Sequence, residues 1–467
     1  MGELSATQST LNYILSFQSS AIISNLTNNG SISSARGIGA LGTIETLNNG
    51  QGGNSSSAST TSLTYAGNLP SNYNIIINSP NHYGQLSVSS PSGTTTFGIY
   101  SGGVSGVAAS TLAKGTYSAV LSGITSSDLT GATAGNYNGF TWRLNNSSGN
   151  IWDLVVTGSS TADTQQSLVE TASALRNTYA LQNAVLVNGF NYDCSVFDQK
   201  NICLSTGGRY STTNSGSVNS TSALLIGAYR LSKQIRLGAY IDQNLSSSGN
   251  VVNLNNSKPM VGLFGLWAER EDGVGAEVKI SAGYGSKDAT ITRQVVGTSE
   301  AGSGSSSLNT TGAQINAKYG FAIIDKTTIS PFLGIRYAQN KMNGYTEASN
   351  SNVTAPLTYS GLNTDVTTAL AGVGIKYQFD PTVALLAIAG VESDLSINNG
   401  IYSATGIIGL TAINFNANPA KTRATVSAGA HYDIDKRQRI SLTGIYREEA
   451  YRSVNTTAVF ATYMVGL

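Results

Sequence analysis

The strongest constraint in this sequence is a two-residue periodicity that runs from Asn201 to the C-terminus. In the stretch 313–321, alanine, isoleucine, tyrosine and phenylalanine occupy every second position, with polar residues or glycine between them. The stretches 369–379 and 424–434 repeat the pattern. Successive side chains of a β-strand point to opposite faces, so each stretch predicts a strand with one apolar and one polar face. The polar face is rich in glycine, which favours the inside of a closed barrel over the wet face of a sandwich.

Twelve segments carry this pattern, an even number of the kind that single-chain outer-membrane barrels have. They span 201–211, 222–231, 235–245, 258–270, 273–292, 310–324, 327–343, 364–379, 382–396, 421–434, 437–450 and 454–467. Tight connections at 232–233, 325–326, 380–381 and 435–436 alternate with long polar ones at 297–309 and 344–363. We place a further strand or hairpin at 400–416 in a long loop outside the wall. The pattern predicts an all-β chain that ends in a 12-stranded antiparallel transmembrane β-barrel.

The composition excludes several functional classes. Lys+Arg 26 and Asp+Glu 25 leave a net charge of +1, so we expect no nucleic-acid partner. Two histidines and two cysteines are too few for a zinc-finger series, a haem box or a rich metal site, and we expect no cofactor. The 23 tyrosines, against 11 phenylalanines, suit a boundary between apolar surface and water.

The stretch 163–187 contains neither glycine nor proline. Larger apolar residues recur there at alternating spacings of four and three, which predicts an α-helix of about 25 residues. Asp163 followed by Gln166 predicts a capping box, and Gly189 lies just past the expected end. Polar side chains forbid contact of this helix with lipid, and they include Glu170, Arg176, Asn177 and Asn183. A helix in the barrel lumen and an ordinary amphipathic helix on a sheet are both compatible with the pattern.

The N-terminal third predicts a different kind of β structure. Short apolar pulses separated by Asn-Gly turns between 21 and 49 are typical of β-solenoid rungs, and a Ser/Asn/Gly spacer follows at 51–62. The runs within 140–156 predict a hairpin whose aromatic residues cap the open end of the solenoid. The first residues form no signal peptide, and we expect the natural N-terminus to lie upstream.

The order of these parts resembles the C-terminal portion of the monomeric autotransporters, the type V secretion family. Strand motifs at 223–231, 235–240 and 329–337 resemble those of the family's translocator. The resemblance implies four parts: residues 1–62, the end of a β-solenoid passenger with its spacer; 63–160, an autochaperone-like region; 161–190, a linker helix in the lumen; and 191–467, the translocator barrel.

The resemblance also implies a function without catalysis. The barrel would insert into the outer membrane of a Gram-negative bacterium, and folding of an adhesin-like passenger at the cell surface would drive export. The expected partners are the lipid bilayer, the barrel assembly machinery, periplasmic chaperones and a host or surface ligand of the passenger, and we expect a monomer. Two other interpretations stay open, namely a porin-like diffusion channel and a secreted hydrolase passenger.

Two departures from the family matter. The assembly signal expected in the last strand consists of Tyr463, Val465 and Leu467, whereas family members usually end in Phe or Trp. Paired asparagines for self-cleavage are absent from the helix, so we expect no autoproteolysis.

Candidate site residues are few. Cys194 and Cys203 predict a structural disulfide in an oxidising periplasm, with two buried free thiols as the alternative. Charged residues on the predicted lumen face would hold the helix or the passenger in transit, or else simply line a hydrated pore. They are Arg230, Arg236, Glu277, Lys279, Lys318, Arg336, Lys376, Glu392, Arg439 and Arg447. The G-x-G-x-x-G at 37–42 lies in a solenoid turn, and no G-x-S-x-G motif is present, so we expect no catalytic residues.

Overall fold

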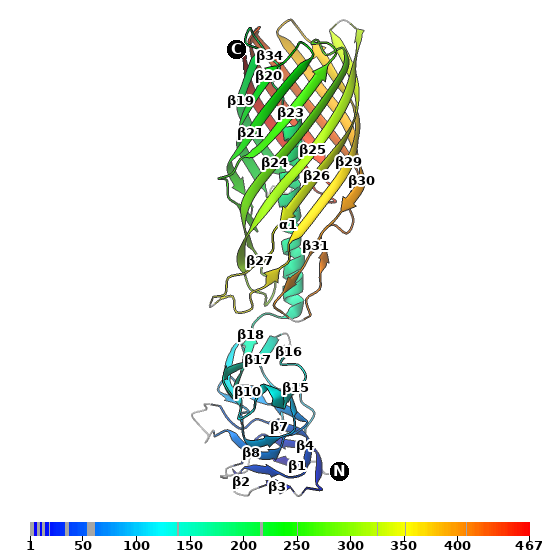
Figure 1. Ribbon diagram of the computed structural model, residues 1–467. Coiled ribbons are helices and arrows are strands. Elements are labelled where there is room, and N and C mark those ends of the chain that lie inside the picture. Colours follow the sequence, from blue (N-terminus) through cyan, green and yellow to red (C-terminus); the bar gives the residue numbers. More distant parts are fainter. Residues whose placement is uncertain are drawn as a thin grey trace.

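The computed structural model describes residues 4–6, 10–11, 15–17, 19–32, 37–53, 61–137, 140–214, 218–249, 251–324, 326–350, 352–407 and 409–467. The molecule is a long column in which a small β-solenoid lies below a tall β-barrel (Figure 1). Helix α1 (Thr161–Asn191) starts between the two parts and runs up into the barrel. We call the rim that faces the solenoid the near rim, and the opposite rim the far rim.

Parallel strands stack into the two sheets of the solenoid. The first contains β1 (Leu4–Ala6), β4 (Ile22–Asn28), β7 (Thr43–Asn49), β9 (Asn72–Ile75), β13 (Thr95–Ile99) and β15 (Leu129–Thr130). The parallel strands of the second are β3 (Leu15–Phe17), β6 (Ile38–Ala40), β8 (Leu63–Asn68), β12 (Leu86–Ser92) and β14 (Gly115–Ser122). Short pieces complete the turns, namely β2 (Thr10–Leu11), β5 (Ser31–Ile32), β10 (Ile77–Ser79), β11 (His82–Tyr83) and the 3-10 turn η1 (Ser126–Asp128).

Aliphatic and aromatic side chains fill the solenoid, and an asparagine ladder joins its rungs. Asn48 donates to Asn25 Oδ1 at 2.8 Å, and Asn74 donates to Asn48 Oδ1 at 2.9 Å. The pairing continues across residue 62, since Ile38 of β6 lies opposite Tyr65 of β8. Rungs therefore lie on both sides of the boundary that composition predicted at 62, because β6 pairs directly with β8. Most of that spacer, 54–60, lies outside the described residues.

The predicted hairpin closes the solenoid. β17 (Phe140–Ser148) and β18 (Ile151–Thr157) pair antiparallel, and β16 (Ala134–Tyr137) adds a third strand. β18 also pairs antiparallel with β14, so the hairpin covers the last parallel edge. Trp152 is buried and donates from Nε1 to the Ile124 carbonyl at 2.8 Å. An edge covered in this way offers no template for pairing with another chain.

Twelve antiparallel strands form the closed barrel, which confirms the predicted fold class. They are β19 (Ile202–Thr213), β20 (Asn219–Arg230), β21 (Ile235–Ser248), β23 (Met260–Ala268), β24 (Gly275–Thr292), β25 (Ser303–Ile324), β26 (Thr327–Met342), β29 (Leu362–Gln378), β30 (Val383–Asn398), β34 (Thr422–Asp435), β35 (Gln438–Glu448) and β36 (Asn455–Gly466). The first and last strands pair over their whole length, from Cys203 opposite Gly466 to Thr213 opposite Thr456. This pairing closes the cylinder.

Short turns lie at the far rim and long connections at the near rim, as the alternation predicted. The largest boundary error concerns β25, which begins at Ser303 and not at residue 310. Its serine-rich start pairs with the end of β24, with Ser303 opposite Thr292. Pairing with the neighbouring strand therefore makes this segment a strand, although its composition is typical of a loop. At the far rim, Asp325 of the predicted 325–326 turn lies outside the described residues.

The segment 400–416 lies outside the wall, as predicted. Its short strands β31 (Ile401–Tyr402) and β33 (Ile413–Asn414) pair with each other, and β32 (Ala404–Thr405) joins β27 (Tyr345–Thr346) and β28 (Thr358–Tyr359). β22 (Val252–Leu254) adds a short partner to the end of β24. These pieces build the cover over α1 at the near rim.

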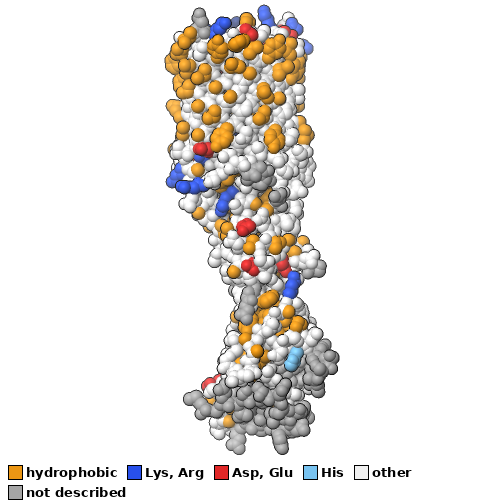
Figure 2. Space-filling model, turned by 180° about the vertical axis from the view of Figure 1, so that it is seen from behind, with side chains coloured by type: hydrophobic (Ala, Val, Ile, Leu, Met, Phe, Trp, Pro, Cys, Tyr) orange, Lys and Arg blue, Asp and Glu red, His pale blue; other side chains and the backbone are white. Residues whose placement is uncertain are grey.

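The outer face of the barrel is apolar. Leu225, Leu263 and Leu333 are 52%, 66% and 68% exposed, and they alternate with lumenal residues along their strands. Figure 2 shows apolar side chains spread over the outer surface of the barrel, with lysine and arginine gathered toward its rims. A band of this kind matches the hydrocarbon layer of a bilayer.

The helix is longer than predicted at both ends. Ser160 is the N-cap, and its hydroxyl accepts from the Asp163 amide at 3.0 Å. The predicted capping box of Asp163 with Gln166 is therefore wrong, because Ser160 supplies the cap acceptor three residues earlier. Gly189 lies inside α1 rather than after it. A Cβ there would lie 2.5 Å from Tyr240 Oη, so packing explains this glycine.

Candidate functional site: the barrel lumen

α1 occupies the part of the lumen nearest the solenoid. Its Val185, Leu186 and Phe190 pack against Met260 and Ala338 of the wall. Two wall glycines permit the approach, because a Cβ on Gly283 or on Gly312 would lie 3.0 Å from Leu186. The glycine-rich inner face seen in the sequence thus meets the helix that it has to accommodate.

The start of α1 is tied to a near-rim loop. Thr298 donates to Asp163 Oδ2 from its amide at 2.8 Å and from its hydroxyl at 2.7 Å, and the Ser160 amide donates to Thr298 Oγ1 at 2.9 Å. The hydrogen bonds from Thr298 lower the pKa of Asp163. The helix is therefore fixed to the barrel where it leaves the solenoid.

The four polar helix residues singled out in the sequence differ in their surroundings. Arg176 donates to the Phe415 carbonyl at 2.6 Å and lies over the Phe415 ring. Asn183 donates to Glu449 Oε2 at 3.2 Å. Glu170 is exposed and accepts from Gln166 of the same helix, so it reaches none of the lumenal cations. Asn177 lines a small cavity at the near rim.

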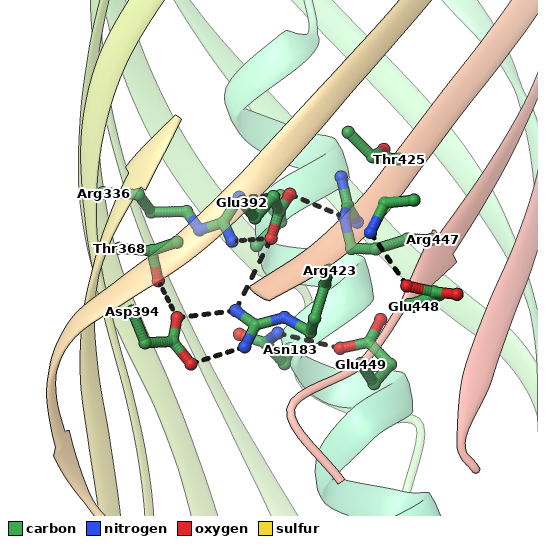
Figure 3. Close-up of polar contacts among 12 residues, drawn as sticks. Asn183, Arg336, Thr368, Glu392, Asp394, Arg423, Thr425, Arg447, Glu448 and Glu449 are labelled. Atoms are coloured by element: carbon green, nitrogen blue, oxygen red, sulfur yellow. Dashed lines mark hydrogen bonds and ion pairs between the residues drawn. The ribbon is translucent and has the colours of Figure 1, made fainter. Parts of the chain in front are cut away.

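The densest charge group of the lumen surrounds Glu392 (Figure 3). Arg447 Nε lies 3.1 Å from Glu392 Oε1, and Arg336 forms a two-point contact with the same carboxylate. Arg423 pairs with Asp394 and lies 3.8 Å from Glu392. All of these side chains are at least nine-tenths buried, which makes their mutual pairing necessary.

This charge group touches the helix. Arg447 donates toward Asn188 Oδ1 of α1 at 3.4 Å, while Asn183 reaches Glu449 one turn earlier. The sequence analysis identified Arg336, Glu392 and Arg447 as lumenal charges but missed Arg423 and Asp394. The two-residue alternation could have identified both. Asp394 lies two residues beyond Glu392 on the same strand face, and Arg423 follows the same alternation in β34.

A second buried group, also missed, lies across the lumen. Arg209 is fully buried and contacts both oxygens of Asp242 at 3.0 Å, and the Tyr192 hydroxyl donates to Asp242 Oδ2 at 3.0 Å. Ser211 and Ser222 accept further hydrogen bonds from the Arg209 guanidinium. Tyr192 directly follows α1, so this group fixes the point where the chain leaves the helix.

Several predicted lumenal charges lie toward the far rim. Arg236 contacts Asp193 at 2.5 Å, Lys279 donates to the Tyr192 carbonyl at 2.7 Å, and Lys318 lies 2.9 Å from Glu277. Arg439 pairs with Asp433 at 2.5 Å. Arg230 donates to Asn201 and Glu271 and lies over the Phe197 ring. Within the part of the chain that the structure describes, Lys376 has no hydrogen-bond or ion-pair partner.

A covalent link and a terminal contact hold the far end of the lumenal segment. Cys194 and Cys203 form a disulfide with a Cα–Cα distance of 5.7 Å, which joins the chain after α1 to the start of β19. The Leu467 carbonyl accepts from the Lys200 amide at 3.0 Å, and the Tyr463 hydroxyl donates to Gln438 at 2.6 Å. Val465 pairs with Leu204 of β19 and Gln438 of β35. The last strand is thus fixed on both sides.

Two cavities lie beyond the end of α1. One of about 460 Å³ lies between the helix end and the wall, and one of about 740 Å³ opens toward the far rim. They share lining residues that include Asp193, Lys318 and Lys376. The helix therefore fills the near half of the lumen and leaves space in the far half.

We also searched the described residues for metal sites and for helices that could span a membrane. No group of three or more His, Cys, Asp or Glu side chains among them is arranged to hold a metal ion. In the same residues, no helix has both the length and the apolar character needed to span a bilayer.

Comparison with known proteins gives both a family and similar structures. The sequence model of the autotransporter beta-domain matches residues 204–446, more than half of the chain. The translocator domain of autotransporter NalP from Neisseria meningitidis is 15% identical with a TM-score of 0.47, and the match covers 64% of this chain and 98% of that one. The transport unit of AIDA-I from Escherichia coli is 14% identical with a TM-score of 0.38, covering 63% and 98%. The search of curated proteins gave no match.

The match of the family model spans eleven of the barrel strands in full or in part, from β19 to β35, with the lumen that they enclose. A barrel of this family is a transport barrel of the Gram-negative outer membrane rather than a catalytic domain. The chain belongs to the autotransporter beta-domain family.

Proposed function

We propose that residues 191–467 export the preceding chain through the outer membrane and then anchor it at the cell surface. In this proposal 161–190 is the linker that stays in the lumen, 63–160 an autochaperone-like region, and 1–62 the end of the passenger with its spacer. One observation carries the proposal: α1 enters the lumen from the solenoid at the near rim, and the chain that follows α1 continues to the start of β19 at the far rim.

Folding of the solenoid supplies the direction of transport. A segment that folds outside cannot slip back through a lumen that one helix already fills. The antiparallel cap, β16 to β18, folds without waiting for rungs further upstream, because β18 pairs with both β17 and β14. β14, once paired with the cap, then serves as the template on which the preceding parallel rungs assemble.

The passenger is adhesive or structural rather than enzymatic. The asparagine ladder and the apolar stack of the solenoid support a rigid structural role. The sequence has no G-x-S-x-G nucleophile elbow for hydrolysis. The protein acts as a monomer in the lipid bilayer, with the barrel assembly machinery and periplasmic chaperones as partners during biogenesis. A host or surface ligand binds the passenger.

Planar-bilayer conductance tests the role of α1. The intact protein should conduct weakly, because α1 fills the near half of the lumen, and deletion of 163–187 should raise the conductance toward that of an open pore. Protease added to intact cells should remove the solenoid from the full-length protein. Open-porin conductance of the intact chain would favour the diffusion channel instead, and esterase or protease activity on intact cells would favour a hydrolase passenger.

A further inference from the structure

The cavity of about 460 Å³ beyond α1 has one apolar side and one cationic side. We call it the lumenal pocket and define it by Phe332, Leu386 and Ile388 on the apolar side and Lys376 on the cationic side. Its volume lies within the range of about 300–1,000 Å³ that is typical of small-molecule sites. None of these four side chains is among the contacts that fix α1 to the wall.

The apolar side exposes aliphatic groups inside the barrel rather than toward lipid. Leu386 and Ile388 share a strand face with Glu392, which points into the lumen, because alternate residues of β30 lie on one face. They are still 37% and 43% exposed. Aliphatic surface in a hydrated lumen is unfavourable unless an apolar group covers it.

Small neighbours leave this surface open. Gly429 lies opposite Leu386, and Gly374 and Ser427 lie opposite Ile388 on the two adjacent strands. No side chain from these positions is long enough to cover the aliphatic groups. The wall therefore forms a recess beside Phe332, whose ring lies over Gly372.

On the cationic side, the ammonium group of Lys376 has no ion-pair partner among the described residues. Lys376 lies directly opposite Leu386 in the strand register, so the ammonium stem and the apolar recess are neighbours. The carboxylates that line the pocket are already paired, Asp193 with Arg236, Asp272 with Arg270, Glu277 with Lys318 and Glu392 with Arg336. Arg336 Nε is also buried without an acceptor. The pocket therefore complements a negative charge.

We propose that the lumenal pocket binds a small amphipathic carboxylate, with its hydrocarbon chain on Leu386 and Ile388 and its carboxylate at Lys376. A purely apolar molecule would leave Lys376 unpaired, and a small inorganic anion would leave the recess uncovered. The ligand enters from the far rim, because the pocket shares Lys376, Leu386 and Lys318 with the cavity of about 740 Å³ that opens there.

Equilibrium dialysis of octanoate against the full chain in lipid nanodiscs tests this proposal, with empty nanodiscs as the reference. We expect saturable binding of octanoate, and no saturable binding of octan-1-ol or inorganic phosphate. Lys376→Gln and Ile388→Ala should each weaken the affinity for octanoate by about fivefold to tenfold. Lys326→Gln at the far-rim turn and Leu385→Ala on the lipid face are matched controls that should leave it unchanged.

A conservative variant keeps the test decisive if Lys376→Gln folds poorly. Lys376→Arg retains the positive charge and should bind octanoate nearly as well as the parent chain. Non-saturable uptake equal to that of empty nanodiscs would overturn the proposal. Equal binding by the parent, Lys376→Gln and Ile388→Ala would overturn it as well, because the ligand would then lie elsewhere. Neither result would bear on export, which depends on α1 and the solenoid.

Discussion

At the scale of single residues, Glu392 is the carboxylate around which three buried arginines gather. Arg336 and Arg447 contact it directly, and Arg423 lies within ion-pair distance (Figure 3). Removing water from charged groups is costly, and only close pairing with good hydrogen-bond geometry offsets the cost. The arrangement therefore couples four strands of the wall, β26, β30, β34 and β35, through one side chain.

We expect Glu392→Gln to lower the free energy of unfolding of the barrel by about 3 kcal/mol, because two buried guanidinium groups lose their counter-charge. Urea-dependent unfolding in detergent micelles, followed by gel mobility, measures the change. Lys258→Gln is the control, since Lys258 and Asp288 form an exposed pair whose loss should cost less than about 1 kcal/mol. Equal effects of the two substitutions would contradict a central role for Glu392.

Glu300 links the solenoid to the barrel. Its carboxylate lies 3.1 Å from Lys114 Nζ of the solenoid and accepts from the amides of Thr354 and Ala355 in a near-rim loop, each at 2.9 Å. Burial acts to raise the pKa of Glu300, but the hydrogen bonds from Ala355, Thr354 and Lys114 outweigh it and hold the pKa below the ordinary value of 4.5.

A lowered pKa fixes the sign of the pH dependence. The contribution of Glu300 to the folded contact is fully present above pH 4.5 and is lost as the pH falls through the lower folded-state value. Amide hydrogen exchange at Thr354 and Ala355 should therefore lose protection in that acidic range. Glu300→Gln should show weaker protection at neutral pH and a smaller acid-dependent loss. Identical pH profiles for the two proteins would exclude Glu300 as the titrating group.

At the scale of elements, α1 is held at its start by a cap, in its middle by side chains of the wall, and after its end by Tyr192 and the disulfide. Each contact comes from a different part of the barrel. Helix propensity alone does not explain the sequence of α1. Glycine is unfavourable inside a helix, yet Gly189 lies in the last turn. The close approach of Tyr240 explains that choice.

Gly189→Ala separates packing from propensity. In an exposed helix this substitution stabilises by about 1 kcal/mol. Here the added Cβ would lie 2.5 Å from Tyr240 Oη and 2.8 Å from the nearest ring carbon, so we expect displaced helix packing, lower thermal stability and higher ion conductance. Ser173→Ala on the exposed face of α1 should change neither quantity. A gain in stability from Gly189→Ala would show that the wall yields at this point.

The elements were predictable because periodicity is a local property. Alternation identified all twelve wall strands, and the absence of glycine and proline identified α1. The groups around Glu392 and Arg209 were only partly predictable, because Arg336, Glu392 and Arg447 belong to strands that are not direct neighbours. Barrel closure and strand register decide which lumenal charges lie next to one another. The sequence of a single strand determines neither. The N-cap was missed for a smaller reason, since two adjacent serines preceded the periodic run.

At the scale of the whole molecule, one continuous chain links a folded column outside the barrel to the wall through its lumen. The stability of the solenoid and the integrity of the barrel are separate properties, because the two parts have separate hydrophobic cores. A substitution in the solenoid core can therefore change the driving force for export while the barrel stays intact. This separation makes the folding-driven proposal testable.

Trp152→Ala provides that test. The indole is buried in the cap and bonded to the Ile124 carbonyl, so its loss should destabilise the solenoid by about 3–5 kcal/mol. We expect slower appearance of the solenoid at the cell surface, measured by protease accessibility on intact cells, with normal barrel folding on gels. Ile151→Ala, at a 38% exposed side chain next to it, should export normally. If Trp152→Ala unfolds the solenoid but reaches the surface at the parent rate, passenger folding does not drive transport, because the lost folding free energy would then have had no effect on the rate.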